Sequence, residues 1–190
     1  REKLTTNPVL RNKCSDKSIT QGAKFNLNEC IEFTEANKGD THILNINGVD
    51  FEDKYFDENQ KIMAYAIFQK PGKNNIEVEV INQNGNSAKT TLVLNVSNVN
   101  PKLNGILKSY SVEKGEETEF IFLYEDPGEQ DKHEARIKWS SSSQWINLTN
   151  VKNGKITVSK KFNEGGQYSA VLEIKDINEP DWNTGNIDSK

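Results

Sequence analysis

Hydrophobic and polar residues alternate along short stretches of this chain, which is the pattern of a strand with one face in a core. The alternation is clearest over residues 76–81 and 90–96 in the first half, and over residues 120–124 and 170–174 in the second. Turn residues bound each stretch. Roughly seven such strands per half, with turn signals every 8 to 12 residues, predict antiparallel β-sandwiches.

One spacing occurs twice. Phe68 is followed by a glycine turn and three alternating apolar residues, and Phe162 is followed by the same pattern 94 residues later. The same offset relates a second set of positions, Thr41, Ile43 and Asn45, to Ala135, Ile137 and Trp139. Pro101 ends the first copy and suits a stiff linker. We therefore predict two sandwich domains, residues 1–99 and 100–190, with residues 1–17 as a leader strand or linker.

Two Asn-Gly pairs predict hairpins. We expect Asn84-Gly85 to form a two-residue type I′ turn, because both central positions of that turn need positive φ. Asn153-Gly154 closes a second hairpin before residues 156–158. The last strand should occupy residues 182–190, but this segment is a poor strand, so we expect a ragged or incomplete edge. No segment has a helical period of useful length.

Composition limits the function. Only 34% of residues are hydrophobic, which fits thin sheets that bury one face. The net charge is −4 and the lysines form no stripe, which argues against nucleic-acid binding. No apolar run approaches the length that crosses a bilayer, so this fragment is not expected to insert into a membrane. Because the chain starts at Arg1 without a signal peptide, we interpret it as part of a longer or processed protein.

Two cysteines, Cys14 and Cys30, lie in the first half. We expect a disulfide, since folds with this strand pattern are mostly extracellular; the alternative is a pair of buried free thiols. A bridge closing a loop of this length would stabilise the fold by about 3 kcal/mol in the chain-entropy model. The sequence has no C-x-x-C motif and no Cys/His cluster, so nothing else indicates redox or metal chemistry.

Residues 162–176 read F-x-x-x-G-x-Y-x-A-x-L-x-I-x-D, and residues 126–139 read D-P-G-x-x-D-x-H-x-A-x-I-x-W. Both stretches resemble signatures of the polycystic-kidney-disease (PKD) domain, an immunoglobulin-like sandwich that is also found in large bacterial surface proteins. The resemblance implies three structural roles. Trp139 fills the space between the sheets, Gly166 permits a tight turn, and Tyr168 ties its hydroxyl to the backbone.

The resemblance is weaker elsewhere. The first half has Asn74 where the family has tyrosine and Asn45 where it has tryptophan. Four serines, residues 140–143, replace the acidic loop that usually follows the core tryptophan. Any role of that acidic loop therefore cannot be transferred to this chain.

Acidic residues gather in two loops, and we consider calcium for them because it prefers six to eight oxygen ligands. The candidate ligands are Asp126, Glu129, Asp131 and Asp176; Asn178, Glu179 and Asp181 lie near the last of these. The alternative is a solvated turn in which Asp126 caps backbone amides. His42 and His133 fall in corresponding loops, and we expect them to be exposed or strand-edge residues without catalytic partners.

Three aromatic residues are candidates for exposure: Tyr110, Trp145 and Trp182. Exposed rings can stack on sugars or anchor a protein partner. Trp145 follows the serine run and is expected at a loop tip, where binding residues concentrate. The alternative is a ring folded back over a sheet edge or wedged between the domains.

The fold and the family resemblance imply a non-catalytic adhesion, spacer or protein-assembly module of a larger surface or secreted protein. We expect it outside the cell, at the cell surface or in the periplasm. Its partner would be a protein or the neighbouring domains of the same polypeptide. The alternative is a glycan- or matrix-binding accessory module of a secreted hydrolase. An enzyme is not expected, because no nucleophile set or metalloprotease motif is present, and calcium is the only cofactor considered.

Overall fold

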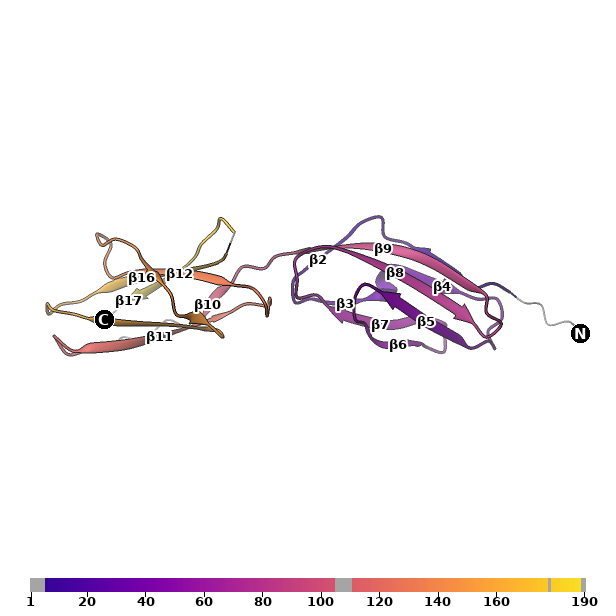
Figure 1. Ribbon diagram of the computed structural model, residues 1–190, viewed down its shortest axis with the longest axis horizontal. Coiled ribbons are helices and arrows are strands. Elements are labelled where there is room, and N and C mark those ends of the chain that lie inside the picture. Colours follow the sequence, from indigo (N-terminus) through magenta and orange to yellow (C-terminus); the bar gives the residue numbers. More distant parts are fainter. Residues whose placement is uncertain (1–5, 105–110, 178, 189–190) are drawn as a thin grey trace, which may run out of the picture. The chain divides into compact units, whose positions relative to one another are not determined.

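The computed structural model describes residues 6–104, 111–177 and 179–188, and it is built of β-strands (Figure 1). The chain divides into two compact units, Arg1–Asn98 and Val99–Lys190, which we call unit 1 and unit 2. Tyr110 and Asn178, named above as candidates, lie outside the described residues. Among those residues no helix is long and apolar enough to cross a membrane. The predicted all-β, immunoglobulin-like sandwich class is confirmed.

Over its described residues, unit 1 contains nine strands and one short 3-10 helix, η1 (Leu27–Glu29). The strands are β1 (Val9–Asn12), β2 (Lys17–Thr20), β3 (Lys24–Asn26), β4 (Ile31–Thr34), β5 (His42–Asn47), β6 (Glu52–Phe56), β7 (Ile62–Ile67), β8 (Gly72–Asn82) and β9 (Ser87–Ser97). One sheet has the order β2-β9-β8-β5 and another the order β3-β7-β6, while β1 pairs with β4. The alternating apolar residues of β8 and β9 point into the core, where Ile76, Val78, Leu92 and Leu94 are fully buried.

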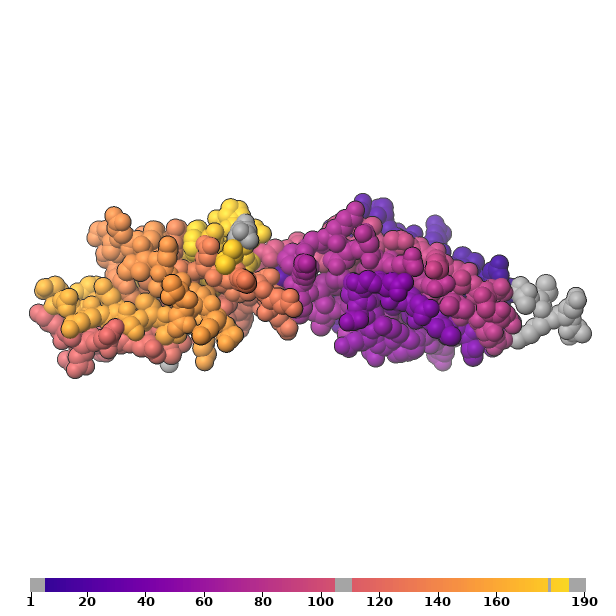
Figure 2. All heavy atoms as spheres, in the orientation of Figure 1, coloured from indigo at the N-terminus to yellow at the C-terminus, as the bar shows by residue number. Residues whose placement is uncertain are grey.

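Much of the segment 9–20 of unit 1 forms strands. β1 pairs antiparallel with β4, and β2 pairs parallel with β9, with Lys17 opposite Leu94. The space-filling view shows this early segment, in indigo, beside the pink β9 segment (Figure 2). These strands are short, and each finds its partner far away in the chain. Local pattern alone therefore left open whether the segment forms strands or a linker.

A disulfide joins Cys14, just after β1, to Cys30, just before β4. The predicted bridge is confirmed. Cys30 is fully buried in the core of unit 1, and Cys14 packs against that core. The bridge therefore ties the N-terminal strand to the body of unit 1.

The part of unit 2 that the structure describes contains eight strands in two sheets. They are β10 (Lys102–Asn104), β11 (Glu117–Glu125), β12 (His133–Lys138), β13 (Ile146–Leu148), β14 (Val151–Lys152), β15 (Lys155–Lys161), β16 (Ser169–Asp176) and β17 (Asn183–Asp188). The sheet orders are β10-β11-β15-β14 and β13-β12-β16-β17. Trp139 lies between the sheets, 8% exposed, with its ring 5.3 Å from that of Phe120 and 5.5 Å from that of Phe162.

The C-terminal edge of unit 2 differs from the prediction. We expected a ragged strand over residues 182–190, but β17 pairs antiparallel with β16 at six consecutive positions, from Asn183 opposite Ile174 to Asp188 opposite Ser169. Edge strands need little hydrophobic alternation, because backbone hydrogen bonds to the neighbouring strand define them. The weak alternation of this segment therefore did not predict how regularly its strand pairs with β16.

The 94-residue offset fails across one pair of strands. In β5, His42 lies opposite Asn82 of β8, and in β12, His133 lies opposite Asp176 of β16. Asn82 and Asp176 are 94 residues apart, but the two histidines are 91 apart. A shift of three residues reverses the face of every side chain. It explains why Ile43 is 62% exposed whereas Ile137, its predicted counterpart, is fully buried.

The two Asn-Gly pairs form different turns. Asn153 and Gly154 both have positive φ, at 53° and 73°, as a type I′ turn requires. At the other pair only Gly85 has positive φ, at 83°, so the predicted type I′ turn there is wrong. The Asn82 side chain accepts hydrogen bonds from the backbone N–H groups of Asn84 and Asn86 at 3.0 Å, and these bonds shape a longer loop.

The sequence-predicted corner around Tyr168 is present in unit 2. The Tyr168 hydroxyl donates a hydrogen bond to the Glu164 carbonyl oxygen at 2.9 Å, and its ring packs 4.4 Å from that of Phe162. Gly166, between Glu164 and Tyr168, has a φ of 149°. A side chain would be strained at this φ. This contact fixes the turn that leads into β16.

Candidate metal centre

Three side chains meet where the two sheets of unit 2 end. Asp126 follows the last residue of β11, His133 is the first residue of β12, and Asp176 is the last residue of β16. Because His133 lies opposite Asp176 in the antiparallel pair, the sheet itself brings these two together. Asp126 comes from the other sheet. One ligand atom from each residue lies within 4.8 Å of the others.

The imidazole of His133 is the centre of this cluster. Its Nε2 atom lies 3.3 Å from Asp126 Oδ2 and 3.3 Å from Asp176 Oδ1. The side chains are nearly buried, with exposed fractions of 7% for His133, 4% for Asp126 and 7% for Asp176. Two carboxylates therefore face one ring nitrogen in a setting where water screens little.

Asp126 uses its two oxygens differently. Oδ1 accepts a hydrogen bond from the Gly128 backbone N–H at 2.6 Å, which is the turn-capping role that the Asp-Pro-Gly sequence suggests. Oδ2 faces His133 instead. The capping bond fixes the carboxylate plane, so the turn holds the second oxygen in place. The capping role and a ligand role therefore do not exclude each other.

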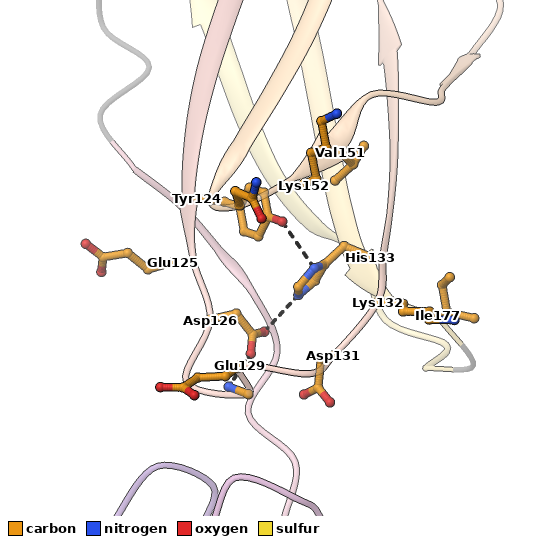
Figure 3. Close-up of a pocket in the computed structure, with 13 residues that line it drawn as sticks. Tyr124, Glu125, Asp126, Glu129, Asp131, Lys132, His133, Val151, Lys152 and Ile177 are labelled. Carbon is orange, nitrogen blue, oxygen red and sulfur yellow. Dashed lines mark hydrogen bonds and ion pairs between the residues drawn. The ribbon is translucent and has the colours of Figure 1, made fainter.

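Tyr124 closes the inner side of the cluster. Its hydroxyl lies 3.2 Å from His133 Nδ1, and the two ring centres are 4.8 Å apart (Figure 3). Burial raises the pKa of the Tyr124 hydroxyl; the backbone hydrogen bond with Gly154 lowers it, and the charges of Asp126 and Asp176 raise it further. The hydroxyl therefore stays protonated well beyond neutral pH and can hold the orientation of the imidazole.

The outer side of the cluster opens into a cleft with a volume of about 690 Å³. Glu129 and Asp131 line this cleft together with Asp126 and His133. In the close-up, the carboxylates of Glu129 and Asp131 point away from the imidazole, whereas Asp126 points toward it (Figure 3). The four residues named for calcium therefore divide into an inner pair, Asp126 and Asp176, and an outer pair on the loop.

The sequence reasoning missed His133. We expected an exposed or strand-edge histidine, but its side chain is 7% exposed and β12 lies between β13 and β16. The expectation was therefore wrong. The signal was present in the spacing: His133 stands two residues before the inward-facing Ala135, and residues two apart share a face of a strand. The calcium assignment stays a prediction.

The aromatic residues that we predicted as binding candidates are not part of the His133 cluster. Trp145 and Trp182 are half-buried, and the Arg136 guanidinium lies over both rings, 4.4 Å and 4.2 Å from their centres. Arg136 also pairs with the Glu173 carboxylate at 2.6 Å. Rings stacked on a cation are held by the sheet and have less free face to offer a ligand. This arrangement resembles the alternative that we considered, in which the rings fold back over the sheet.

Unit 1 has a related cluster at the corresponding strand ends. His42 Nε2 lies 3.7 Å from Glu35 Oε2, and its ring packs 4.9 Å from that of Phe33. The position opposite His42 in the sheet is Asn82 rather than an aspartate. Thr6 fills the space: its hydroxyl donates to Glu35 Oε1, and its carbonyl oxygen accepts from Asn82 Nδ2 at 3.0 Å.

No protein-family model matches the chain, and no curated protein matches it either. Solved structures do share its fold. A crystal structure of titin domains matches with a TM-score of 0.52 and 12% identity, over 98% of this chain and 66% of that one. This similarity shows the fold alone.

Two further solved structures are similar at lower scores. One contains fibronectin(III)-like modules of Clostridium thermocellum CbhA, with a TM-score of 0.33 and 12% identity over 96% of this chain and 94% of that one. The other is a fragment of human CDH23, with a TM-score of 0.40 and 15% identity over 96% of this chain and 63% of that one.

Proposed function

We propose that this chain is a non-catalytic spacer or adhesion segment of a larger surface or secreted protein. The observation that carries the proposal is that each unit has its own closed hydrophobic core. The core of unit 1 also carries a disulfide, and disulfides persist in oxidising compartments outside the cytosol. Separately folded sandwiches in series are suited to spanning distance and presenting surfaces to a partner.

The PKD-like identity of the two units belongs to the same proposal. It is supported by Trp139 between the sheets and by the Tyr168 hydroxyl bonded to the Glu164 carbonyl. We place the domain boundary at about residue 99. The expected partners are another protein or neighbouring domains of the same polypeptide.

Mechanical unfolding of single molecules tests the spacer role. The full chain would be stretched between handles at its two ends. We expect two separate unfolding steps, one for each core. Under reducing conditions one step should lengthen by about 55 Å, because the bridge spans 16 residues and an extended residue adds at most about 3.5 Å. A single step for the whole chain would contradict independent units, and a step length unchanged by reduction would show that the bridge does not restrict the extension of unit 1.

A glycan-binding accessory role is the second candidate, and one observation bears on it. Trp145 and Trp182 lie side by side with Arg136 on one sheet of unit 2, so a sugar would have to compete with the guanidinium for the ring faces. Binding to a polysaccharide panel separates the two roles. Binding that is lost in both Trp145→Ala and Trp182→Ala, but kept in the unit 1 variant Tyr55→Ala, would favour the accessory role over the spacer role.

A further inference from the structure

The buried imidazole of His133 lacks a hydrogen-bonding partner at Nε2. That atom is close to two carboxylate oxygens, at 3.3 Å each, yet neither contact has the geometry of a hydrogen bond. Oδ2 of Asp126 is likewise buried without a hydrogen bond. A buried polar atom without a partner costs about 1–3 kcal/mol. Nε2 therefore faces both carboxylates without making a hydrogen bond to either of them.

The distances fit a small cation between Nε2 and the two carboxylates. A tetrahedral ion with bonds of about 2.1 Å to nitrogen and oxygen separates its ligand atoms by about 3.4 Å. The two distances from Nε2 to the carboxylate oxygens are 3.3 Å. Asp126 and Asp176 come from different sheets, and their repulsion in a buried corner is offset by a positive charge between them.

We propose that Asp126, His133 and Asp176 bind one divalent transition-metal ion of the zinc type. Nε2 of His133 supplies the nitrogen ligand, and Asp126 and Asp176 supply one oxygen each. A water molecule from the cleft that Asp126, His133, Glu129 and Asp131 line would supply a fourth ligand. The ion would join the ends of β11, β12 and β16, and so connect the two sheets of unit 2.

The ligand set distinguishes this ion from calcium. Calcium takes six to eight oxygen ligands and does not use imidazole in its usual sites. Among the described residues, two carboxylates converge on the point that Nε2 faces, and the third donor is nitrogen. Imidazole with carboxylates suits zinc and its first-row neighbours. The proposal therefore keeps Asp126 and Asp176 from the calcium prediction and changes the ion.

Tyr124 supports the ring from the other side. A histidine that binds a metal through Nε2 usually donates its Nδ1–H to a nearby oxygen, which fixes the ring. The Tyr124 hydroxyl oxygen, 3.2 Å from Nδ1, is placed to accept that hydrogen bond. Its role would be to position His133, since it does not face the ion.

The first experiment titrates the full 190-residue chain with Zn²⁺ by calorimetry after treatment with a chelator. We expect one equivalent to bind, and millimolar Ca²⁺ not to compete. Co²⁺ serves as the spectroscopic probe: a bound tetrahedral ion gives intense visible absorption bands that an ion in water lacks. In NMR spectra, Zn²⁺ should shift the His133 ring signals and leave those of His42 in place.

Matched variants in the two units then identify the ligands. His133→Gln and Asp176→Asn should each weaken Zn²⁺ binding at least 100-fold, whereas His42→Gln, which changes the related corner of unit 1, should leave it unchanged. Tyr124→Phe should weaken binding about 10-fold, the usual effect of losing an outer-shell partner. Phenylalanine fits such a corner, since Phe33 packs on His42 in unit 1. Circular dichroism checks that each variant is folded.

Three results would overturn the proposal. The first is the absence of saturable Zn²⁺ binding by the folded chain. The second is binding that His42→Gln reduces as strongly as His133→Gln, which would show that binding is not specific to the cluster in unit 2. The third is Ca²⁺ binding that needs Asp126 and Asp176 but is unaffected by His133→Gln, which would restore the calcium assignment. Because none of these measurements involves force or a protein partner, their failure leaves the spacer role standing.

Discussion

Unit 1 and unit 2 build the same corner of their sandwiches in different ways. In both, a histidine begins a strand and packs on an aromatic ring, Phe33 in unit 1 and Tyr124 in unit 2. In unit 1 the Glu35 carboxylate faces the histidine, and the Thr6 hydroxyl donates a hydrogen bond to that carboxylate. In unit 2 two carboxylates face it and a cleft opens beside them.

The two corners differ in the residue that lies opposite the histidine. Asn82 of unit 1 offers an amide that donates to the Thr6 carbonyl, while its oxygen caps the following loop. Asp176, at the corresponding position of unit 2, is a carboxylate that faces His133. An amide satisfies its neighbours without charge, whereas a second carboxylate creates a concentration of negative charge. His42 Nε2 and Glu35 Oε2 of unit 1 are also buried without a hydrogen bond, but Asn82 brings no second carboxylate to that corner, so we expect the stronger response to an ion in unit 2.

The largest expected effect tests whether the units are independent. Trp139→Ala removes a buried ring from the core of unit 2 and should destabilise that unit by about 3–5 kcal/mol. All three tryptophans of the chain lie in unit 2, so tryptophan fluorescence during urea unfolding reports on unit 2 alone. The half-buried Trp145 gives the control, because Trp145→Ala should have a smaller effect. An equal loss of stability in unit 1, measured by amide hydrogen exchange, would contradict independence.

Removing the disulfide is the corresponding change in unit 1. The double variant Cys14→Ala/Cys30→Ala should lower the free energy of unfolding of unit 1 by about 3 kcal/mol, because the bridge restricts the unfolded chain. Urea unfolding followed by far-ultraviolet circular dichroism measures it. The fluorescence transition of unit 2 serves as the internal control. If that transition moves by a similar amount, the bridge acts beyond unit 1.

Asn82→Asp gives unit 1 the second carboxylate of unit 2. It removes the amide that donates to the Thr6 carbonyl at 3.0 Å and adds charge near Glu35, so unit 1 should lose about 1–3 kcal/mol. Asn84→Asp is the control: it adds the same charge two residues further on, in the exposed loop after β8, and leaves the Thr6 contact intact. Amide hydrogen exchange of β8 and β9 measures both. Equal effects of the two variants would assign the loss to charge alone.

The smallest expected effect concerns an ion pair at the surface of unit 1. The side-chain hydrogen bond with Lys17, whose Nζ lies 2.9 Å from Glu29 Oε2, lowers the pKa of Glu29, and partial burial opposes this. A lowered carboxyl pKa stabilises the fold above the pKa of the unfolded chain, and this stabilisation is lost as pH falls through the folded pKa.

Glu29→Gln should therefore cost less than about 1 kcal/mol at neutral pH, since the pair is partly exposed. The difference from the parent chain should shrink as the pH falls below 4.5, the usual value for a glutamate, and disappear once the pH is below the lowered pKa of the folded chain. Thermal unfolding at several pH values measures it, with the exposed Glu58→Gln as the control. A difference that persists at pH 3 would show that charge is not the cause.

Much of the fold could be predicted from the local pattern of apolar, polar and turn residues. The alternation over residues 76–81 predicted β8, because one sheet face must be buried to remove apolar side chains from water. Asn153-Gly154 predicted its hairpin, because those residues adopt positive φ at low cost. Asn84-Gly85 carried the same signal and formed another turn, because the Asn82 side chain imposes its own hydrogen bonds on the loop.

Only part of the candidate site could be predicted from the sequence. The sequence indicated Asp126 and Asp176 as oxygen donors, but it gave no distance between loops 50 residues apart in the chain. Antiparallel pairing placed Asp176 opposite His133, and the packing of one sheet on the other brought Asp126 to the same point. Glu129 and Asp131 are equally acidic, but they line the cleft and point away from His133 (Figure 3).

The sequence by itself determined the fold class, the disulfide-forming residues and the acidic character of the loops, because each depends on residue type and short-range spacing. Only the tertiary structure decided that His133 is buried between two carboxylates and that Thr6 closes the related corner of unit 1. The physical reason is that hydrophobic burial requires only alternation along a strand, whereas a cluster of polar atoms requires the register of strands that are distant in the chain.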